Sequence, residues 1–166
     1  MNLPDPAGVE TIHVESAREM LAAVETALPA DIAIFAAAVA DWRVASEGGE
    51  KIKKDGGKTP TFALVENPDI LATVAKRAND RPSLVVGFAA ETEKVIEHAK
   101  AKLARKGCDL IVANDVGGTG VMGGDANTVH LVTASGVETW PTLPKGEVAA
   151  RLVAHIAGLA PARQAD

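Results

Sequence analysis

The stretch DIAIFAAAVADWR (residues 31–43) is a continuous apolar run that ends in an acid, a tryptophan and an arginine. Such a run is short for a buried helix. It is typical of a central strand in a parallel sheet, because helices cover such a strand on both faces. The polar residues that close it indicate where the strand reaches the edge of its sheet.

Two later stretches, RPSLVVGFAAET (81–92) and CDLIVANDVGG (108–118), have the same character. Helix patterns alternate with the strands, over 16–28 and over 92–107, where Gly107 is the stop signal. This alternation predicts an α/β fold, a three-layer Rossmann-like sandwich with a mostly parallel sheet. Right-handed crossovers bring the carboxyl ends of the parallel strands to one edge, where ligands bind in such sheets.

The N-terminal half contains further predicted elements. VETIHV (9–14) predicts a strand, and Ser16 with Glu19 has the spacing of a capping box. EKIKKDGGKTPTFALVE (50–66) predicts two short strands joined by a Gly turn, forming an arm outside the main sheet. NPDILATVAKRA (67–78) predicts a helix with Asn67 as N-cap and Pro68 in the first helical position.

The C-terminal part is predicted to add a hairpin and a helix. NTVHLVTASGVETW (127–140) has the alternation of an antiparallel hairpin, with its turn at Ala134–Gly136. A helix is predicted over 145–159. Its inward face is expected to consist of Val148, Leu152, Val153 and Ile156.

The composition fits one α/β domain. Of 166 residues 47% are hydrophobic but only 3% aromatic, so aliphatic residues must build the core. The formal net charge of −5 argues against nucleic acid as a partner, although a local basic cluster can still bind a small anion. The single cysteine, Cys108, is predicted to be a buried core residue. With no segment long enough to span a membrane and no signal-peptide pattern, we expect a cytoplasmic protein without a membrane partner.

The ends of the three predicted strands form the first candidate site. AAAVADWR, GFAAET and IVANDVGG all place small residues before a polar one. Small residues let a ligand approach the backbone, although alanines also pack against helices and acids often begin loops. Because three strands share this ending at one edge, we favour a ligand site. The Gly-rich segment from Gly117 to Gly124 is either a lid over that edge or an irregular loop.

Basic residues form the second candidate. Residues spaced four apart make one stripe along the helix predicted over 92–107: Lys94, His98, Lys102 and Lys106. A bound polyanion would relieve their repulsion, whereas a solvated helix face is the plain alternative. The helix start at NPDI attracts anions, but Asp69 there is equally explained as an acid favourable to the helix dipole. Neither standard nucleotide fingerprint occurs, nor G-x-S-x-G.

Taken in order, AAAVADWR, EKIKK, NPDIL, VVGFAAET, KLARKGCDLIVAND and NTVHL resemble the bacterial phosphopantothenate–cysteine ligases. The resemblance covers nearly all of residues 9–157. This ligase is usually the C-terminal part of a bifunctional coenzyme A biosynthesis protein, fused behind a flavin-dependent decarboxylase. The resemblance therefore implies a Rossmann-like fold and a homodimer, with the arm contributing to the contact between subunits.

The resemblance also implies a reaction. With CTP and Mg²⁺ or Mn²⁺, the family activates the carboxylate of 4′-phosphopantothenate as an acyl-cytidylate and releases pyrophosphate. L-cysteine then displaces CMP to give 4′-phosphopantothenoylcysteine. Nucleotidyl transfer relies on positioning and on cations that stabilise phosphate charge, so the lack of a Ser/His/Asp or Cys/His set is expected.

Family roles are carried over position by position. Ala36 and Ala37, with Phe35 before them, match the segment whose backbone meets the nucleotide, and Asp41 matches the nucleotide-site aspartate. Lys51 matches a lysine on the triphosphate side that turnover needs. The other matched CTP-binding positions are Pro68, Asp69, Ile70, Leu71, Phe88, Lys102 and Lys106. Lys94 and His98 gain no role, nor do Trp42 and Arg43, and no metal ligand is identified.

The sequence departs from the family at its start. Relatives begin with a further βαβ unit and an Asn-x-Ser-Ser-Gly segment, whereas this chain begins at MNLPDPAGVE. We therefore expect residues 1–166 to be the ligase domain without that unit and without the decarboxylase, with little or no turnover. Two alternatives stay open: a nucleotide-binding module without catalysis, and a different α/β nucleotide-binding enzyme such as an NAD(P) dehydrogenase.

Overall fold

The computed structural model describes residues 5–46, 61–117 and 126–159. The chain divides into two compact units. One unit consists of residues 1–27 and 38–69, and is called here the arm unit. The other consists of residues 28–37 and 70–166, and is called the sheet unit.

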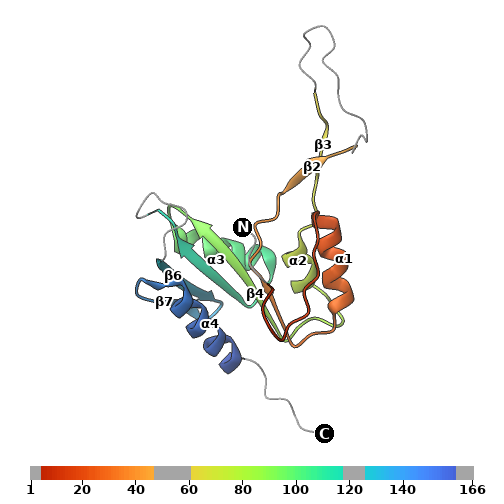
Figure 1. The fold of residues 1–166 in the computed structure, drawn as a ribbon. Coiled ribbons are helices and arrows are strands. Elements are labelled where there is room, and N and C mark those ends of the chain that lie inside the picture. Colours follow the sequence, from red (N-terminus) through yellow and green to blue (C-terminus); the bar gives the residue numbers. More distant parts are fainter. Residues whose placement is uncertain (1–4, 47–60, 118–125, 160–166) are drawn as a thin grey trace. The chain divides into compact units, whose positions relative to one another are not determined.

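The sheet unit is built on a six-stranded sheet (Figure 1). Its order is β1 (Ile32–Phe35), β4 (Leu84–Glu91), β5 (Leu110–Asp115), β6 (Ala126–Thr133) and β7 (Gly136–Thr139), and β8 (Leu143–Pro144) pairs with β6. The strands β1, β4 and β5 are parallel, and the hairpin β6–β7 joins them antiparallel through β5. The hairpin and its turn were predicted from 127–140 and are confirmed.

Helices cover both faces of this sheet. On one face α4 (Lys145–Leu159) packs with alternate strand residues in a core cluster: Leu84, Val86, Leu110, Val112, Val129, Leu131, Trp140, Val148, Leu152 and Ile156. On the other face lie α2 (Ile70–Ala75) and α3 (Val95–Lys106), which contact β4 and β5. Successive strand residues point to opposite faces, so a continuous apolar run fills both layers. The predicted α/β sandwich is confirmed.

The arm unit contains α1 (Ala17–Ala27) and a separate two-stranded antiparallel sheet. Its strands are β2 (Trp42–Val44) and β3 (Leu64–Glu66), with Trp42 opposite Glu66 and Val44 opposite Leu64. A β arm outside the main sheet was predicted, but its first described strand lies at Trp42–Val44. The strand and turn predicted within residues 50–60 lie outside the described residues.

Hydrogen bonds at the start of α1 confirm the capping box. The Ser16 hydroxyl accepts from the Glu19 backbone N–H at 3.2 Å. The Glu19 carboxylate accepts from the backbone N–H groups of Glu15 and Ser16 at 2.8 and 2.9 Å. These bonds satisfy N–H groups that a helix start leaves without intrahelical partners. They also hold the pKa of Glu19 below its ordinary value.

The ends of α3 are set by two left-handed residues. Gly107 has φ 75° and donates its N–H to the Leu103 carbonyl, which confirms it as the helix stop. At the other end Lys94 has φ 47°, so α3 begins at Val95 rather than at the predicted Thr92. Helical dihedrals cannot pass through a left-handed residue, and therefore the first predicted turn is lost.

Three further sequence predictions are wrong. Residues 9–14 form no strand, and both Val9 and Ile12 are exposed. Asn67 does not cap α2 and Pro68 is not its first residue, because α2 begins at Ile70 and the Asn67 side chain bonds to the Ala40 carbonyl. Val153 is 66% exposed, since it follows Leu152 by one residue and so turns about 100° away from the inward face of α4. No helix within the described ranges is long and apolar enough to cross a membrane.

Candidate functional site at the sheet edge and the arm

The carboxyl ends of β4 and β5 form a closely fitted edge in the sheet unit. Glu91 and Asp115 are register partners there, and the Val116 N–H donates to the Glu91 carbonyl at 3.0 Å. At Gly117 a β-carbon would lie 2.3 Å from the Thr92 carbonyl oxygen, so only glycine fits. The edge predicted from the strand endings therefore exists, and backbone contacts hold it together.

The alanines of the opening stretch lie just past the first strand. The strand β1 ends at Phe35, opposite Gly87 of β4, and Ala36 and Ala37 follow it as exposed residues. Exposure of these small residues leaves their backbone open to a ligand, as the strand-ending argument requires. The apolar run is thus a strand only in its first part.

Lys102 contacts the backbone of Phe88 in the sheet unit. The Phe88 side chain is half-buried and packs against the core cluster below α4. Lys102 comes from α3 and donates from Nζ to the Phe88 backbone carbonyl at 2.8 Å. One of the two helix lysines that the family resemblance selects thus contacts the backbone of Phe88, while the Phe88 ring lies on the α4 side of the sheet.

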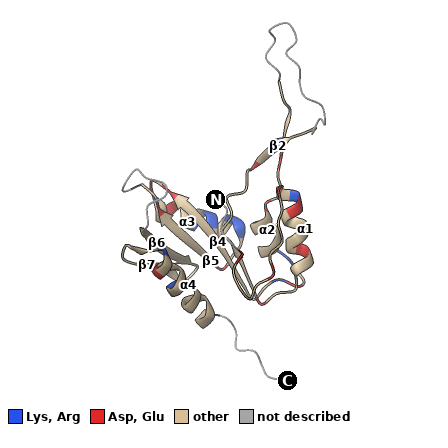
Figure 2. Cartoon of the chain, viewed as in Figure 1, with Lys and Arg blue, Asp and Glu red and all other residues tan. Residues whose placement is uncertain are grey.

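The basic stripe of α3 divides into two pairs, and Figure 2 shows the basic residues along this helix. Lys94 and His98 are exposed and lie near acids, with Lys94 Nζ 3.7 Å from Glu97 and His98 Nδ1 3.1 Å from Glu91. Lys102 and Lys106 are half-buried instead. A uniformly solvated face would expose all four residues. The two half-buried lysines are the same two to which the family resemblance gives a role.

The remaining predicted residues of α2 contribute mainly to packing. Ile70 is buried in the core and Leu71 is half-buried, with a methyl group 2.7 Å from where a β-carbon on Gly87 would lie. Their side chains therefore fix α2 against the sheet. The CTP contacts predicted for these two positions stay predictions.

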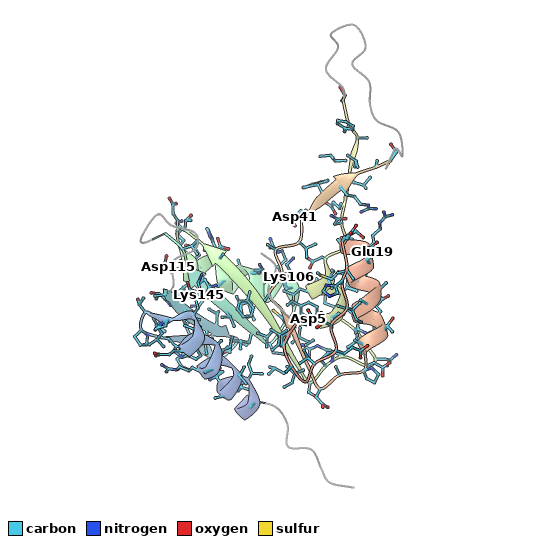
Figure 3. The ribbon with its side chains drawn as sticks, viewed as in Figure 1. Asp5, Glu19, Asp41, Lys106, Asp115 and Lys145 are labelled. Carbon is cyan, nitrogen blue, oxygen red and sulfur yellow. The ribbon has the colours of Figure 1, made fainter. Side chains whose placement is uncertain are left out.

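In the arm unit the structure brings Asp41 next to the NPD segment. The Asp41 carbonyl accepts the Asn67 backbone N–H at 2.8 Å, which extends the β2–β3 ladder by one residue pair. Asp41 is exposed and lies at the start of β2 (Figure 3). Pro68 and Asp69 follow Asn67, Pro68 half-buried and Asp69 exposed. Lys51, the predicted catalytic lysine, lies outside the described residues.

Two further observations bear on the chemistry. Cys108 is buried as predicted, and burial raises the pKa of its thiol, which makes it a poor nucleophile. Among the described residues no group of three or more His, Cys, Asp or Glu side chains is arranged to hold a metal ion.

Comparison with known proteins identifies the family. Residues 1–159 match the family described as the DNA/pantothenate metabolism flavoprotein C-terminal domain. The chain belongs to this family. The resemblance seen in the sequence motifs is thereby confirmed.

Relatives of known name agree with the family match. The coenzyme A biosynthesis bifunctional protein CoaBC of Haemophilus influenzae is 43% identical over 157 residues, covering 94% of this chain and 39% of that protein. CoaBC of Mycobacterium bovis is 46% identical over 146 residues, covering 82% of this chain and 35% of that protein. The chain thus spans less than two fifths of the length of these relatives.

Solved structures show the same fold. The crystal structure of the C-terminal domain of CoaBC has a TM-score of 0.71 and 33% identity, and the match covers 95% of this chain and 69% of that one. A Streptococcus pneumoniae DNA/pantothenate metabolism flavoprotein has a TM-score of 0.73 at 19% identity, which supports the fold alone.

Sequence reasoning missed the partners of Asp41. Arg43 was given no role and Asn67 was taken for a helix cap, yet Asn67 bonds to the backbone on both sides of Asp41 and Arg43 bonds to Glu66 and Asn67. The two residues are 24 positions apart, so no local spacing could reveal the contact. Only the pairing of β2 with β3 brings them together.

Proposed function

We propose that the chain is the ligase part of a coenzyme A biosynthesis enzyme that joins 4′-phosphopantothenate to L-cysteine at the expense of CTP. The observation that carries the proposal is the family match over residues 1–159, together with relatives named as coenzyme A biosynthesis bifunctional proteins. The proposal includes fusion to a flavin-dependent decarboxylase in the full-length protein and a cytoplasmic location, where CTP is available.

The proposed reaction has two steps. An oxygen of the 4′-phosphopantothenate carboxylate attacks the α-phosphorus of CTP, and pyrophosphate leaves with the electron pair of the broken P–O bond. The cysteine amine then attacks the acyl carbon, the acyl–oxygen bond to CMP breaks, and the amine loses a proton. Neither step needs a nucleophile from the protein, which agrees with a buried Cys108 whose thiol pKa is raised.

The chain's residues would position the nucleotide and stabilise its charge. Lys102 is held at the Phe88 backbone carbonyl, on the α3 side of the sheet, and so keeps a cation fixed near the carboxyl end of β4. Lys51 and Lys106 are proposed to add charge at the phosphates and at the nucleotide. Held cations of this kind stabilise the pentacovalent phosphorus at no cost of reorganisation.

Mg²⁺ or Mn²⁺ is proposed to accompany the triphosphate. Mg²⁺ commonly binds through phosphate oxygens and water with only one or two carboxylates from the protein. The lack of a three-residue cluster in the part of the chain that the structure describes agrees with such binding. We assign no residue to the cation.

A homodimer is proposed through the arm unit. One face of the β2–β3 sheet presents Trp42, Val44 and Leu64, and Phe62 just before β3 is also exposed. Exposed apolar groups gathered in this way favour burial against a second copy of the same chain. Sedimentation equilibrium of the chain with and without Trp42→Ser tests this, and a monomer in both cases contradicts it.

The test of the reaction is pyrophosphate release. The full-length protein is mixed with CTP, Mg²⁺ and 4′-phosphopantothenate, first without and then with cysteine. Release of pyrophosphate that requires both CTP and 4′-phosphopantothenate supports the ligase. Binding of CTP without release of pyrophosphate supports the binding module. Binding of NAD(P) in place of CTP would favour the dehydrogenase alternative. In the full-length protein, Lys51→Ala is expected to abolish turnover while its thermal stability is kept.

A further inference from the structure

Asn67 holds the backbone of the Asp41 stretch from two sides. Its backbone N–H donates to the Asp41 carbonyl at 2.8 Å, and its side-chain Nδ2 donates to the Ala40 carbonyl at 2.8 Å. The Ala40 carbonyl, in the peptide unit before Asp41, and the Asp41 carbonyl, in the peptide unit after it, are therefore both fixed by hydrogen bonds. Such double anchoring removes much of the rotation that would otherwise turn the Asp41 side chain.

Arg43 in turn fixes Asn67. Its guanidinium Nη1 donates to the Glu66 carbonyl and to Asn67 Oδ1, the latter at 3.3 Å. An amide group has a donor end and an acceptor end. With Oδ1 directed at Arg43, Nδ2 is directed at Ala40, so the arginine sets the orientation on which the second anchor depends.

The carboxylate of Asp41 is what remains available after these contacts. Within the described ranges no hydrogen bond to that carboxylate is found, whereas its backbone is anchored. The arm unit contains no fully buried described residue, so packing does not explain the order of this stretch. The hydrogen bonds of Asn67 and Arg43 are the contacts among the described residues that explain its order.

We propose that Arg43 and Asn67 are positioning residues that hold the Asp41 carboxylate for the nucleotide. The proposal rests on the proposed function, in which Asp41 binds CTP. It gives a role to the arginine at the end of AAAVADWR and to the asparagine of NPDIL. Their effect on CTP runs through Asp41, and neither residue contacts the reacting atoms.

A double-mutant cycle tests this dependence. Kd for CTP is measured by calorimetry for Asn67→Ala, Arg43→Met and Asp41→Ala alone, and for each of the first two combined with Asp41→Ala. Each positioning variant alone is expected to weaken binding roughly five- to tenfold, the effect of one hydrogen bond. In the Asp41→Ala background the same changes are expected to weaken it less than about twofold, because the group they position is gone.

Controls separate positioning from loss of fold. Asn79→Ala, at an exposed asparagine outside the site, is expected to change neither Kd nor the melting temperature. Asn67→Asp keeps the acceptor for Arg43 and loses the donor to Ala40, so it should weaken binding as Asn67→Ala does, with unchanged circular dichroism. It replaces Asn67→Ala in the cycle if that variant fails to fold.

The outcomes are distinguishable. Additive effects of Asn67 and Asp41 changes, or normal CTP affinity in both positioning variants, overturn the proposal while the proposed function stands. Failure of the unaltered chain to bind CTP contradicts the proposed function, and with it the assignment of Asp41 on which the positioning role depends.

Discussion

The two units of the chain are ordered by different forces. Every fully buried hydrophobic residue among those described belongs to the sheet unit, from Ile70 to Ile156. In the arm unit α1 has no buried residue, and the central residues of β2 and β3 are only half-buried. In the arm unit, hydrogen bonds order the backbone locally, at the Ser16–Glu19 capping box and around Asn67.

This difference predicts where a substitution is costly. Burial of apolar surface contributes most of the stability of a folded unit, while single hydrogen bonds contribute about 1 kcal/mol each. Truncations in the sheet unit should therefore lower global stability, and changes in the arm unit should act locally.

Leu152→Ala should have the largest effect. This side chain is buried between α4 and the sheet, and its loss is expected to lower the free energy of unfolding by about 2–5 kcal/mol. Val153→Ala, one residue away and exposed, is the matched control and should change it by less than about 0.5 kcal/mol. Leu21→Ala in the half-buried face of α1 should cost about 1 kcal/mol. Urea unfolding measures all three, and equal losses for Leu21 and Leu152 would break the contrast.

Gly117→Ala should come next. The added β-carbon would lie 2.3 Å from the Thr92 carbonyl oxygen, so the edge between β4 and β5 must shift, at a cost of about 1–3 kcal/mol. Gly136→Ala is the control, because a β-carbon there meets no atom within 4 Å. Thermal unfolding of both variants gives the comparison. A similar melting temperature for the two variants would show that the edge has room for a β-carbon at Gly117.

Ser16→Ala should act on the arm unit alone. The loss of the cap at α1 is expected to cost about 1 kcal/mol of local stability. Hydrogen exchange of α1 amides should accelerate, while β4 and β5 amides keep their protection, because the change touches no core residue. Uniform acceleration across both units would contradict the separation of the two regions.

The smallest predicted effect is a pH dependence of the same cap. Hydrogen bonds from the backbone N–H groups of Glu15 and Ser16 hold the pKa of Glu19 below its ordinary value of 4.5. A lowered pKa in the folded state contributes stability above pH 4.5 that is lost as the pH falls through the lowered value. Amide exchange in α1 should therefore differ between the unaltered chain and Glu19→Gln at pH 7, and converge in acid. A constant difference would show that the carboxylate is not the group responsible.

The same contrast explains what the sequence could predict. In the sheet unit, periodicity follows burial, so the strands around Val86 and Val112 and the stop at Gly107 are recovered from the pattern alone. In the arm unit no described residue is buried, so hydrophobic periodicity does not indicate the secondary structure there. Val9 and Ile12 therefore predict a strand that does not form, and Asn67 predicts a cap although its amide bonds to Ala40.

Parts of the candidate site were out of reach for a related reason. The capping box could be found because Ser16 and Glu19 are three residues apart. The contact of Lys102 with the Phe88 carbonyl, and that of Arg43 with Asn67, depend on strand pairing and helix packing between distant segments. Resemblance to the family could select Lys102 and Phe88, but it gave no role to Arg43.

Titration of the chain with CTP in the presence of Mg²⁺, followed by calorimetry, tests the central claim most directly. We predict saturable binding at one site per chain, with ATP bound more weakly under the same conditions. Lys102→Met should weaken the binding of CTP without lowering the melting temperature by more than a few degrees. The absence of CTP binding, or equal affinity for CTP and ATP, would contradict the assignment of this chain as a CTP-dependent ligase domain.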